Sequence, residues 1–209
     1  MNMDYTDKSV WSIDKIRHFL MNNVKQERFQ HIMGVAESAK SLAVHYGESI
    51  ADAEVAAYYH DILKDRNKEW LVSYIREEGE DPGEGLLAWK TLHAQAGAIF
   101  AKSEGGISNL EILNAVRYHT TGRASMGLLE KIIFVADFIE AGRTFDGVDE
   151  IRAIAESDLD RAVFESLNSS ISYLRKKNEY VMSTSLEARI YYENLISERT
   201  ANEKRNESH

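Results

Sequence analysis

The residues of this chain that could do chemistry are histidines and aspartates that stand among apolar neighbours. The clearest case is the pair His60-Asp61, which follows the run Ala56-Ala57-Tyr58-Tyr59. Burying an ionisable pair costs several kcal/mol unless something compensates, and metal coordination is a frequent form of compensation. Taken alone, a His-Asp pair also fits a helix end whose polar residues face water. The metal interpretation therefore depends on partners elsewhere in the sequence.

Such partners occur on other segments. Asp137 is the most informative, because an unpaired carboxylate between Val135-Ala136 and Phe138-Ile139 would be strongly destabilising or neutralised. One histidine on an apolar helical face is more often a hydrogen-bonded core residue than a ligand. Four of them with two carboxylates, spread over five predicted helices or helix ends, indicate a metal site. The predicted ligands are His31, His60, Asp61, His93, His119 and Asp137.

Six ligands exceed what one four-coordinate ion needs, so we predict two adjacent metal ions bridged by Asp61. The sequence contains no cysteine, which excludes disulfides, thiolate nucleophiles and cysteine-ligated zinc. Nitrogen and oxygen ligands suit iron, manganese, nickel or zinc. Two ions roughly 3.5 to 4 Å apart can lower the pKa of a bridging water toward about 7 and stabilise an in-line displacement at phosphorus. The predicted chemistry is therefore hydrolysis of a phosphorylated substrate.

Cations near the ligands would bind the phosphates of such a substrate. Lys64 lies four residues after His60, so its ammonium can reach the same site on a continuing helix, and we take Asp61 and Lys64 as catalytic candidates. Arg143 follows Asp137 by six residues, in a loop where it can clamp a phosphate. The alternative for each cation is a solvated surface charge. With the loop 119–127, rich in hydroxyls and glycine, the candidate substrate contacts are Arg28, Lys64, Thr120, Thr121, Gly122, Arg123 and Arg143.

The elements that must position these residues are predicted to be helices throughout. Apolar residues recur every three or four positions, there is a single proline, and few segments alternate as strands do. Ser12 and Asn67 are expected to cap helices, and Gly47 to end one. An all-α single domain follows, with predicted helices at about 13–20, 26–46, 51–64, 68–78, 92–103, 109–119 (capped by Ser108), 128–140, 148–156, 158–177 and 185–197.

Composition narrows the classes of partner. The 209 residues suffice for one domain, which we place at 12–197, between an N-terminal extension (1–11) and a polar, frayed tail (198–209). A net charge of −9 argues against a nucleic-acid polymer but permits a small phosphorylated ligand. No stretch is apolar enough to cross a bilayer, so we expect no membrane partner and a cytoplasmic location. Apolar surface on the C-terminal helices leaves a homodimer open.

These residues, in this order in an all-helical chain, resemble those of the HD-domain metal-dependent phosphohydrolases. More narrowly, several stretches are similar to the YqeK family of symmetrical diadenosine tetraphosphate hydrolases. A His-Asp pair alone is unspecific, whereas the stretches that begin at His119 and at Ala136 are quite specific. The likeness covers roughly residues 12 to 197. The stretches are Arg28-Phe29-Gln30-His31 with Gly34-Val35-Ala36, His60-Asp61-Ile62-Leu63-Lys64, His119-Thr120-Thr121-Gly122, and Ala136-Asp137-Phe138-Ile139-Glu140-Ala141-Gly142-Arg143.

The resemblance implies symmetrical hydrolysis of diadenosine tetraphosphate and related dinucleoside polyphosphates to two nucleoside diphosphates, at a two-metal centre that favours iron. All six expected ligand types stand at matching positions. Phe138 stands where a tyrosine is often expected and Ala141 where a proline is expected, differences that bear on how a base or sugar packs. Two alternatives stay open. One is another HD-type hydrolase, acting on mononucleotides or guanosine alarmones, and the other is a non-catalytic, metal-dependent module that senses a nucleotide.

Overall fold

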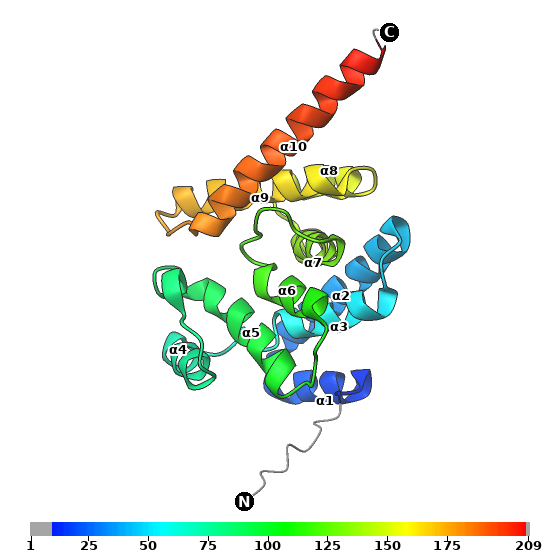
Figure 1. The fold of residues 1–209 in the computed structure, drawn as a ribbon. Coiled ribbons are helices and arrows are strands. Elements are labelled where there is room, and N and C mark those ends of the chain that lie inside the picture. Colours follow the sequence, from blue (N-terminus) through cyan, green and yellow to red (C-terminus); the bar gives the residue numbers. More distant parts are fainter. Residues whose placement is uncertain (1–9, 208–209) are drawn as a thin grey trace, which may run out of the picture.

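The structure, a computed structural model, describes residues 10–207 of the 209-residue chain. Within this range the protein is all-α, with ten α-helices, two short 3-10 helices and no strand (Figure 1). The predicted fold class is therefore confirmed. The elements are α1 (Ile13–Asn23), α2 (Gln26–Tyr46), α3 (Ile50–His60), α4 (Lys68–Glu77), η1 (Gly83–Leu86), η2 (Trp89–Thr91), α5 (Leu92–Ser103), α6 (Leu110–Tyr118), α7 (Leu128–Ile139), α8 (Val148–Ala155), α9 (Leu159–Lys176) and α10 (Ser183–Glu207).

The apolar helix α7 occupies the centre of the bundle. It packs against α2, α3, α6, α8 and α9, and its residues Ile132, Ile133 and Val135 are fully buried. A helix that is apolar on most sides is stable only where neighbours cover those sides. Because helices surround α7, a polar residue in its last turn, Asp137, faces other helices more than it faces water.

Several helix boundaries follow from local capping. Ser12 and Asn67 accept hydrogen bonds from the backbone N–H groups of Lys15 and Trp70, at 3.2 and 2.8 Å. Gly47 ends α2 in the left-handed conformation, with φ of +75°, which a residue without a Cβ adopts at no steric cost. The predicted starts of α1 and α4 and the predicted end of α2 are confirmed.

The predicted end of the third helix is wrong. This helix ends at His60, because Asp61 leaves the helical conformation (φ −114°, ψ 17°) and residues 61–65 continue as turns. Ile62 and Leu63 are buried within these turns. The apolar pattern therefore runs past the end of the helix and does not reveal it.

Two other boundaries also differ from prediction. Asn109 caps α6 in place of Ser108, since its side-chain oxygen accepts from the N–H of Glu111 at 2.9 Å. The last helix, α10, continues to Glu207, so the predicted fraying from residue 198 is wrong for residues up to 207. Its distal half, which is polar and rich in Glu and Arg, extends beyond the bundle (Figure 1). These residues favour a helix, yet without an apolar stripe they leave no periodic signal.

The N-terminal boundary involves Trp11, which the prediction assigns to an extension. Its ring packs against Phe19 and Phe100, with ring centroids 5.5 and 5.7 Å apart. Its backbone N–H donates to the backbone oxygen of Gly105 at 3.0 Å. The remainder of the predicted extension and the last two residues of the tail, 1–9 and 208–209, lie outside the described range. None of the helices between residues 10 and 207 has the length and apolar character needed to cross a bilayer. The division into 1–11, 12–197 and 198–209 stays a prediction.

Candidate active site

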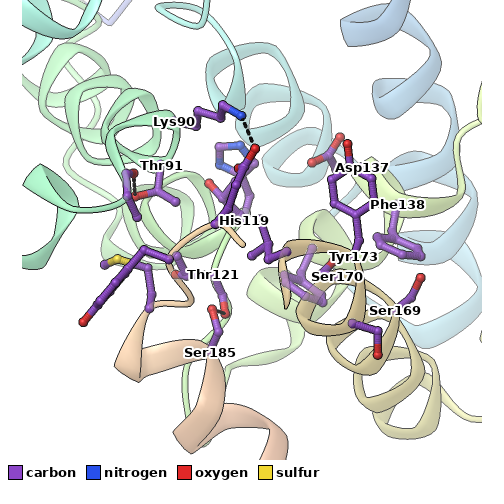
Figure 2. A pocket seen from close by; sticks show the side chains of 18 of the residues that line it. Lys90, Thr91, His119, Thr121, Asp137, Phe138, Ser169, Ser170, Tyr173 and Ser185 are labelled. Atoms are coloured by element: carbon purple, nitrogen blue, oxygen red, sulfur yellow. Dashed lines mark hydrogen bonds and ion pairs between the residues drawn. The ribbon is translucent and has the colours of Figure 1, made fainter. Parts of the chain in front are cut away.

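A cavity of about 1140 Å³ opens where α7 and α9 face the segment 87–91 (Figure 2). It is somewhat larger than the roughly 300–1,000 Å³ of ordinary small-molecule sites, so it has room for an extended ligand. Many of the residues singled out from the sequence line it: Lys64, His119, Thr120, Thr121, Asp137 and Arg143.

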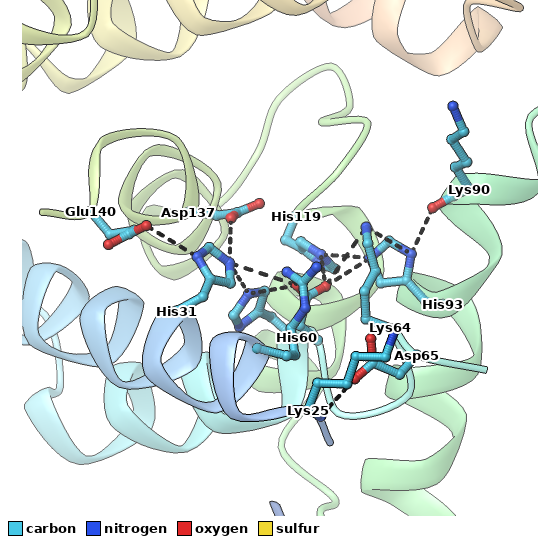
Figure 3. Close-up of polar contacts among 12 residues, drawn as sticks. Lys25, His31, His60, Lys64, Asp65, Lys90, His93, His119, Asp137 and Glu140 are labelled. Carbon is cyan, nitrogen blue, oxygen red and sulfur yellow. Dashed lines mark hydrogen bonds and ion pairs between the residues drawn. The ribbon is translucent and has the colours of Figure 1, made fainter. Parts of the chain in front are cut away.

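All six predicted metal ligands gather in one cluster, and two of them, His119 and Asp137, line this cavity. Figure 3 labels the four histidines and Asp137. Each of the six ligands belongs to a set of three whose ligand atoms lie within 4.8 Å of one another. Five segments contribute, and most ligands stand at helix ends, where a side chain reaches past its own helix. They are His31 in α2, His60 and Asp61 at the end of α3, His93 in the first turn of α5, His119 at the end of α6 and Asp137 in the last turn of α7.

Asp61 lies between two pairs of histidines. Its Oδ2 atom is 3.6 Å from the Nε2 atoms of both His31 and His60. Its Oδ1 atom is 3.0 Å from Nε2 of His93 and 3.5 Å from Nε2 of His119. The two Nε2 atoms are 3.4 Å apart in the first pair and 3.1 Å apart in the second. The cluster thus has two halves, which we name the His31 half and the His93 half, and they share one carboxylate.

Three of the four histidines are oriented by their own helical turns. In each, Nδ1 donates to the backbone carbonyl oxygen three residues earlier in the chain. Because a carbonyl only accepts, Nδ1 carries the hydrogen and Nε2 presents its lone pair to the cluster. The donor and acceptor residues are His60 and Ala57 at 2.6 Å, His93 and Lys90 at 2.7 Å, and His119 and Val116 at 2.7 Å.

His31 is oriented by a different kind of partner, the carboxylate of Glu140. Nδ1 of His31 donates to Oε1 of Glu140 at 3.2 Å, across 109 residues of sequence, and Nε2 lies 3.0 Å from Oδ1 of Asp137. Glu140 is only 6% exposed and also accepts from the N–H of Gly142 at 2.6 Å. A carboxylate on the distal nitrogen fixes the ring and raises its basicity as a ligand. Glu140 is a site residue that the sequence analysis missed.

Two glycines make room for the carboxylate of Glu140. A Cβ atom built on Gly34 would lie 2.7 Å from Oε2, and one on Gly142 would lie 3.0 Å from both carboxylate oxygens. Gly34 follows His31 by three residues, and Glu140 follows Asp137 by three, so each stands one helical turn from a ligand. This spacing is the signal that could have identified Glu140 in the sequence.

The pKa values of the imidazoles also differ within the cluster. Burial lowers the pKa of His60 to about 4 and that of His93 to about 3, so both rings are neutral near pH 7. Burial acts in the same direction on His31, but its hydrogen bond to Asp137 and the charges of Asp137 and Asp61 outweigh burial and raise its pKa. The His31 ring is therefore the most basic of the three.

The donor set fits metal ions. Burial acts to raise the pKa of the Asp61 and Asp137 carboxyls, but the surrounding imidazoles outweigh burial and hold both below the usual range. Oδ1 of Asp61 is buried and has no hydrogen-bond partner among the residues described. Imidazole lone pairs that face an ionised carboxylate repel one another unless a cation lies among them. Nitrogen and oxygen donors in this number are suited to divalent transition metals.

Two partly exposed cations, both lining the cavity, stand one at each half. Nζ of Lys64 lies 3.1 Å from Nε2 of His93 and 3.9 Å from Oδ1 of Asp61. Arg143 donates from Nη2 to Oδ1 of Asp137 at 2.7 Å and from Nε to the backbone oxygen of Asp137 at 3.0 Å. Lys64 reaches the cluster from the turn after α3 and not from the continuing helix that the sequence predicts. Positive charge thus flanks the cluster on both sides.

Two other arginines that the sequence singles out are paired with carboxylates. Nη1 of Arg28 donates to Oδ2 of Asp61 at 2.5 Å, which makes it a partner of the shared carboxylate. Arg123 is paired with Glu130 through two hydrogen bonds of 2.7 and 2.6 Å, and its guanidinium lies 5.3 Å from the ring centroid of Tyr118. Neither arginine lines the cavity. Arg123 therefore ties the loop 123–127 to the first turn of α7, because Glu130 also accepts from the N–H of Gly127.

The loop after α6 contributes to the cavity through its two threonines. Oγ1 of Thr120 is buried without a hydrogen-bond partner among the residues described. The hydroxyl of Thr121 donates to the oxygen of Gly122 at 3.0 Å. Gly122 has φ of +61°, and a Cβ there would lie 3.4 Å from Leu167, so this glycine serves the turn. Of the two threonine hydroxyls in this loop, only that of Thr121 has a hydrogen-bond partner among the residues described.

Comparisons with known proteins agree with this geometry. The HD domain family matches residues 28–193. The protein named bis(5'-nucleosyl)-tetraphosphatase, symmetrical, from Halalkalibacterium halodurans is 42% identical over 164 residues, which cover 78% of this chain and 88% of that protein. The protein of the same name from Bacillus subtilis is 43% identical over 157 residues, 75% and 84% of the two chains. A crystal structure from Clostridium acetobutylicum, described as a predicted HD superfamily hydrolase involved in NAD metabolism, superposes with a TM-score of 0.86 at 40% identity and covers 88% of this chain and 98% of that one.

Proposed function

The chain belongs to the HD domain family, and from this premise we propose that it hydrolyses diadenosine tetraphosphate and related dinucleoside polyphosphates symmetrically to two nucleoside diphosphates. The relatives from H. halodurans and B. subtilis carry the name of this activity, and they align over most of their own length. The HD domain implies a metal-dependent reaction, and the cluster of histidines and aspartates has the donors for it. The protein is therefore an enzyme of the phosphoric anhydride hydrolase class.

The observation that carries the proposal is the position of Asp61 between two histidine pairs beside a cavity lined by Lys64 and Arg143. We propose that His31, His60, Asp61, His93, His119 and Asp137 hold two metal ions and that Asp61 is shared between them. When bound, such a pair of ions supplies an activated water and neutralises charge on the oxygens of the reacting phosphate. Iron is the favoured metal, and manganese, nickel or zinc suit the same ligands.

The protein's own residues bind and orient the substrate. We propose that Lys64 and Arg143 contact phosphates on either side of the scissile bridge, since each flanks one half of the cluster. Thr120, which lines the cavity, is a further proposed contact of these phosphates. Arg28 acts through Asp61, whose orientation and charge it supports. Arg123 and Gly122 are left out of the proposed contacts, because the first is paired with Glu130 and the second serves the turn.

The wider setting of the reaction also belongs to this proposal. The partner is a small dinucleotide and not a nucleic-acid polymer, in agreement with a net charge of −9. The predicted cytoplasmic location is part of the same proposal. A homodimer stays a prediction.

The test is a product analysis with purified protein loaded with Fe²⁺ or Mn²⁺. Diadenosine tetraphosphate should give ADP as the only nucleotide product, because water attacks at the central bridge, and a chelator should abolish the reaction. Chromatography separates ADP from ATP and AMP. An equimolar mixture of ATP and AMP would contradict symmetrical cleavage.

The same assay separates the alternatives. Faster release of phosphate from mononucleotides, or of pyrophosphate from guanosine alarmones, would favour another HD-type hydrolase. Binding without turnover across several divalent metals would favour a sensing module. Either result would replace the proposed activity.

A further inference from the structure

Several exposed aromatic side chains surround the cavity. Trp89, Phe145, Tyr173 and Tyr180 are between 36% and 59% exposed, and all four line it. Large apolar side chains exposed in one concave region mark a surface that is covered by a ligand. An aromatic face suits a nucleobase in particular, because every base can stack on it.

These side chains form two separate groups. The first, the Trp89 group, comprises Leu87, Trp89 and Tyr180 and comes from η2, the residues before it and the segment before α10. Polar contacts hold these segments together: the hydroxyl of Tyr180 donates to Glu84 at 2.6 Å, and Lys90 pairs with Glu179 at 2.6 Å. The second, the Phe145 group, comprises Phe138, Phe145 and Tyr173. The rings of Phe138 and Phe145 touch edge to face, with centroids 4.9 Å apart.

The segments that carry the two groups lie on opposite sides of the cavity. In Figure 2, Lys90 and Thr91 of η2 stand on one side and Phe138 on the other, with His119 between them. Trp89 precedes His93 by four residues, and the two are joined through η2, so the Trp89 group adjoins the His93 half and Lys64. Phe138 directly follows Asp137, so the Phe145 group adjoins the His31 half and Arg143. Each half of the cluster thus has its own cation and its own aromatic group.

We propose that the Trp89 group and the Phe145 group each stack one base of the dinucleotide, an inference that rests on the proposed function and deepens it. A ligand held by a base at each end presents its middle phosphates to the cluster between them. Hydrolysis there breaks the central P–O–P bridge, adds one water and leaves a diphosphate on each nucleoside. The symmetry of the products follows from the two base sites and not from the metal ligands alone.

Direct binding of ADP, which is one half of the substrate, tests this. Calorimetric titration of the Mn²⁺-loaded protein should show two ADP per chain. Trp89→Leu and Phe145→Leu should each bind one ADP and raise KM for diadenosine tetraphosphate about tenfold, within the range for loss of one base–aromatic stack. Trp89→Phe keeps a ring and should keep both sites. Inhibition by inorganic tripolyphosphate, which has no base, should be the same in all variants.

The chain supplies matched controls. Trp70 is 37% exposed, close to the 40% of Trp89, and Tyr191 is 36% exposed, as is Phe145, but neither lines the cavity. Trp70→Leu and Tyr191→Leu should therefore bind two ADP and keep the wild-type KM. One ADP per wild-type chain, or two ADP that persist in both test variants, would overturn the inference.

The inference and the proposed function fail in distinguishable ways. Cleavage of diadenosine tetraphosphate with an unchanged KM in both variants would sink the inference and leave the activity in place. No cleavage, with the change from two ADP to one, would remove the hydrolase and leave two nucleotide sites.

Discussion

The two halves of the cluster are built by different means. In the His93 half, both histidines are oriented by carbonyl oxygens three residues earlier in the same helical turn. In the His31 half, His60 follows that rule, whereas His31 depends on Glu140, a residue 109 positions away. A backbone carbonyl cannot be removed by substitution, but a carboxylate can. The His31 half is therefore the part of the site whose geometry depends on a single distant side chain.

The comparison extends to charge. Burial lowers the pKa of His60 and of His93, two of the histidines that a backbone carbonyl orients. Burial also acts to lower the pKa of His31, but Asp137 and Asp61 outweigh it and raise that pKa. A carboxylate on one imidazole nitrogen and another near the second make the ring a stronger base. Two of the locally oriented rings, His60 and His93, are thus neutral near pH 7, whereas the ring oriented by Glu140 has a raised pKa.

The largest effect should come from the residue that both halves share. Asp61→Ala should lose both metal ions and all hydrolysis, because each half loses an oxygen ligand and the imidazoles lose their central anion. His60→Ala and Asp137→Ala should likewise lose metal and activity together. Metal content per chain, measured by mass spectrometry, checks this. Asp149→Ala, whose side chain is 90% exposed, is the control and should keep its metal. Full metal occupancy in Asp61→Ala would contradict the assignment.

The next largest effect should come from Glu140 and should be confined to the His31 half. Loss of such a carboxylate behind a histidine ligand weakens metal binding by about 10–100-fold. Glu140→Ala should show this loss at one ion, and Glu140→Gln, which keeps an oxygen for Nδ1 of His31, should lose less. Competition with a coloured chelator resolves the two affinities. An equal loss of affinity for both ions would show that the orientation of His31 affects both halves of the cluster.

A smaller effect is expected from Gly34→Ala. Alanine in a helix normally stabilises by up to about 1 kcal/mol relative to glycine, but here its Cβ would lie 2.7 Å from Oε2 of Glu140. The substitution should therefore lower both stability and metal affinity by displacing the carboxylate. In Glu140→Ala the same change should become neutral or stabilising, a strong non-additivity that a double-mutant cycle in urea measures. Additive effects would exclude steric coupling between the two residues.

The smallest effect is a pH dependence of the metal-free protein. The pKa of His93 is about 3 in the folded chain against 6.5 in the unfolded chain, so below pH 6.5 only the unfolded chain takes up the proton. The free energy of unfolding should therefore fall as the pH drops from 7 to 5. His31 contributes to the free energy of unfolding with the opposite sign. Because its pKa is raised in the folded chain, it stabilises the fold below pH 6.5, and this stabilisation is lost as the pH rises through the pKa of the folded chain. His93→Gln should flatten the pH dependence and His31→Gln should steepen it, as urea unfolding at pH 7, 6 and 5 would show.

Much of the fold and the ligand set can be predicted from the sequence, because the signals are local. Apolar periodicity predicts the helices, and Ser12, Asn67 and Gly47 mark boundaries through contacts within a few residues. The ligands stand out because each is a polar residue in an apolar run. The misses have physical reasons too. The turns after His60 keep an apolar pattern, and the distal half of α10 has none.

The cations show where such prediction stops. Lys64 and Arg143 lie beside the cluster, but Arg28 pairs with Asp61 and Arg123 with Glu130. All four look alike in the sequence as charged residues near a ligand. The anion that each cation meets depends on how three segments pack together: α2, α7 and the turns that follow α3. Asp65, in those turns, contributes to this packing because its carboxylate accepts from the backbone N–H of Lys25 at 2.9 Å.

The sequence by itself determined the helical class of this protein and the six candidate ligands, because apolar periodicity and a polar residue within an apolar run are properties of a short segment. Only the tertiary structure decided that Asp61 lies between two pairs of histidines, that Glu140 orients His31 in a space left by two glycines, and that aromatic side chains flank both ends of the cavity. Those features join residues far apart in the chain. Their contacts form only when the buried faces of α2, α3, α5, α6 and α7 pack together.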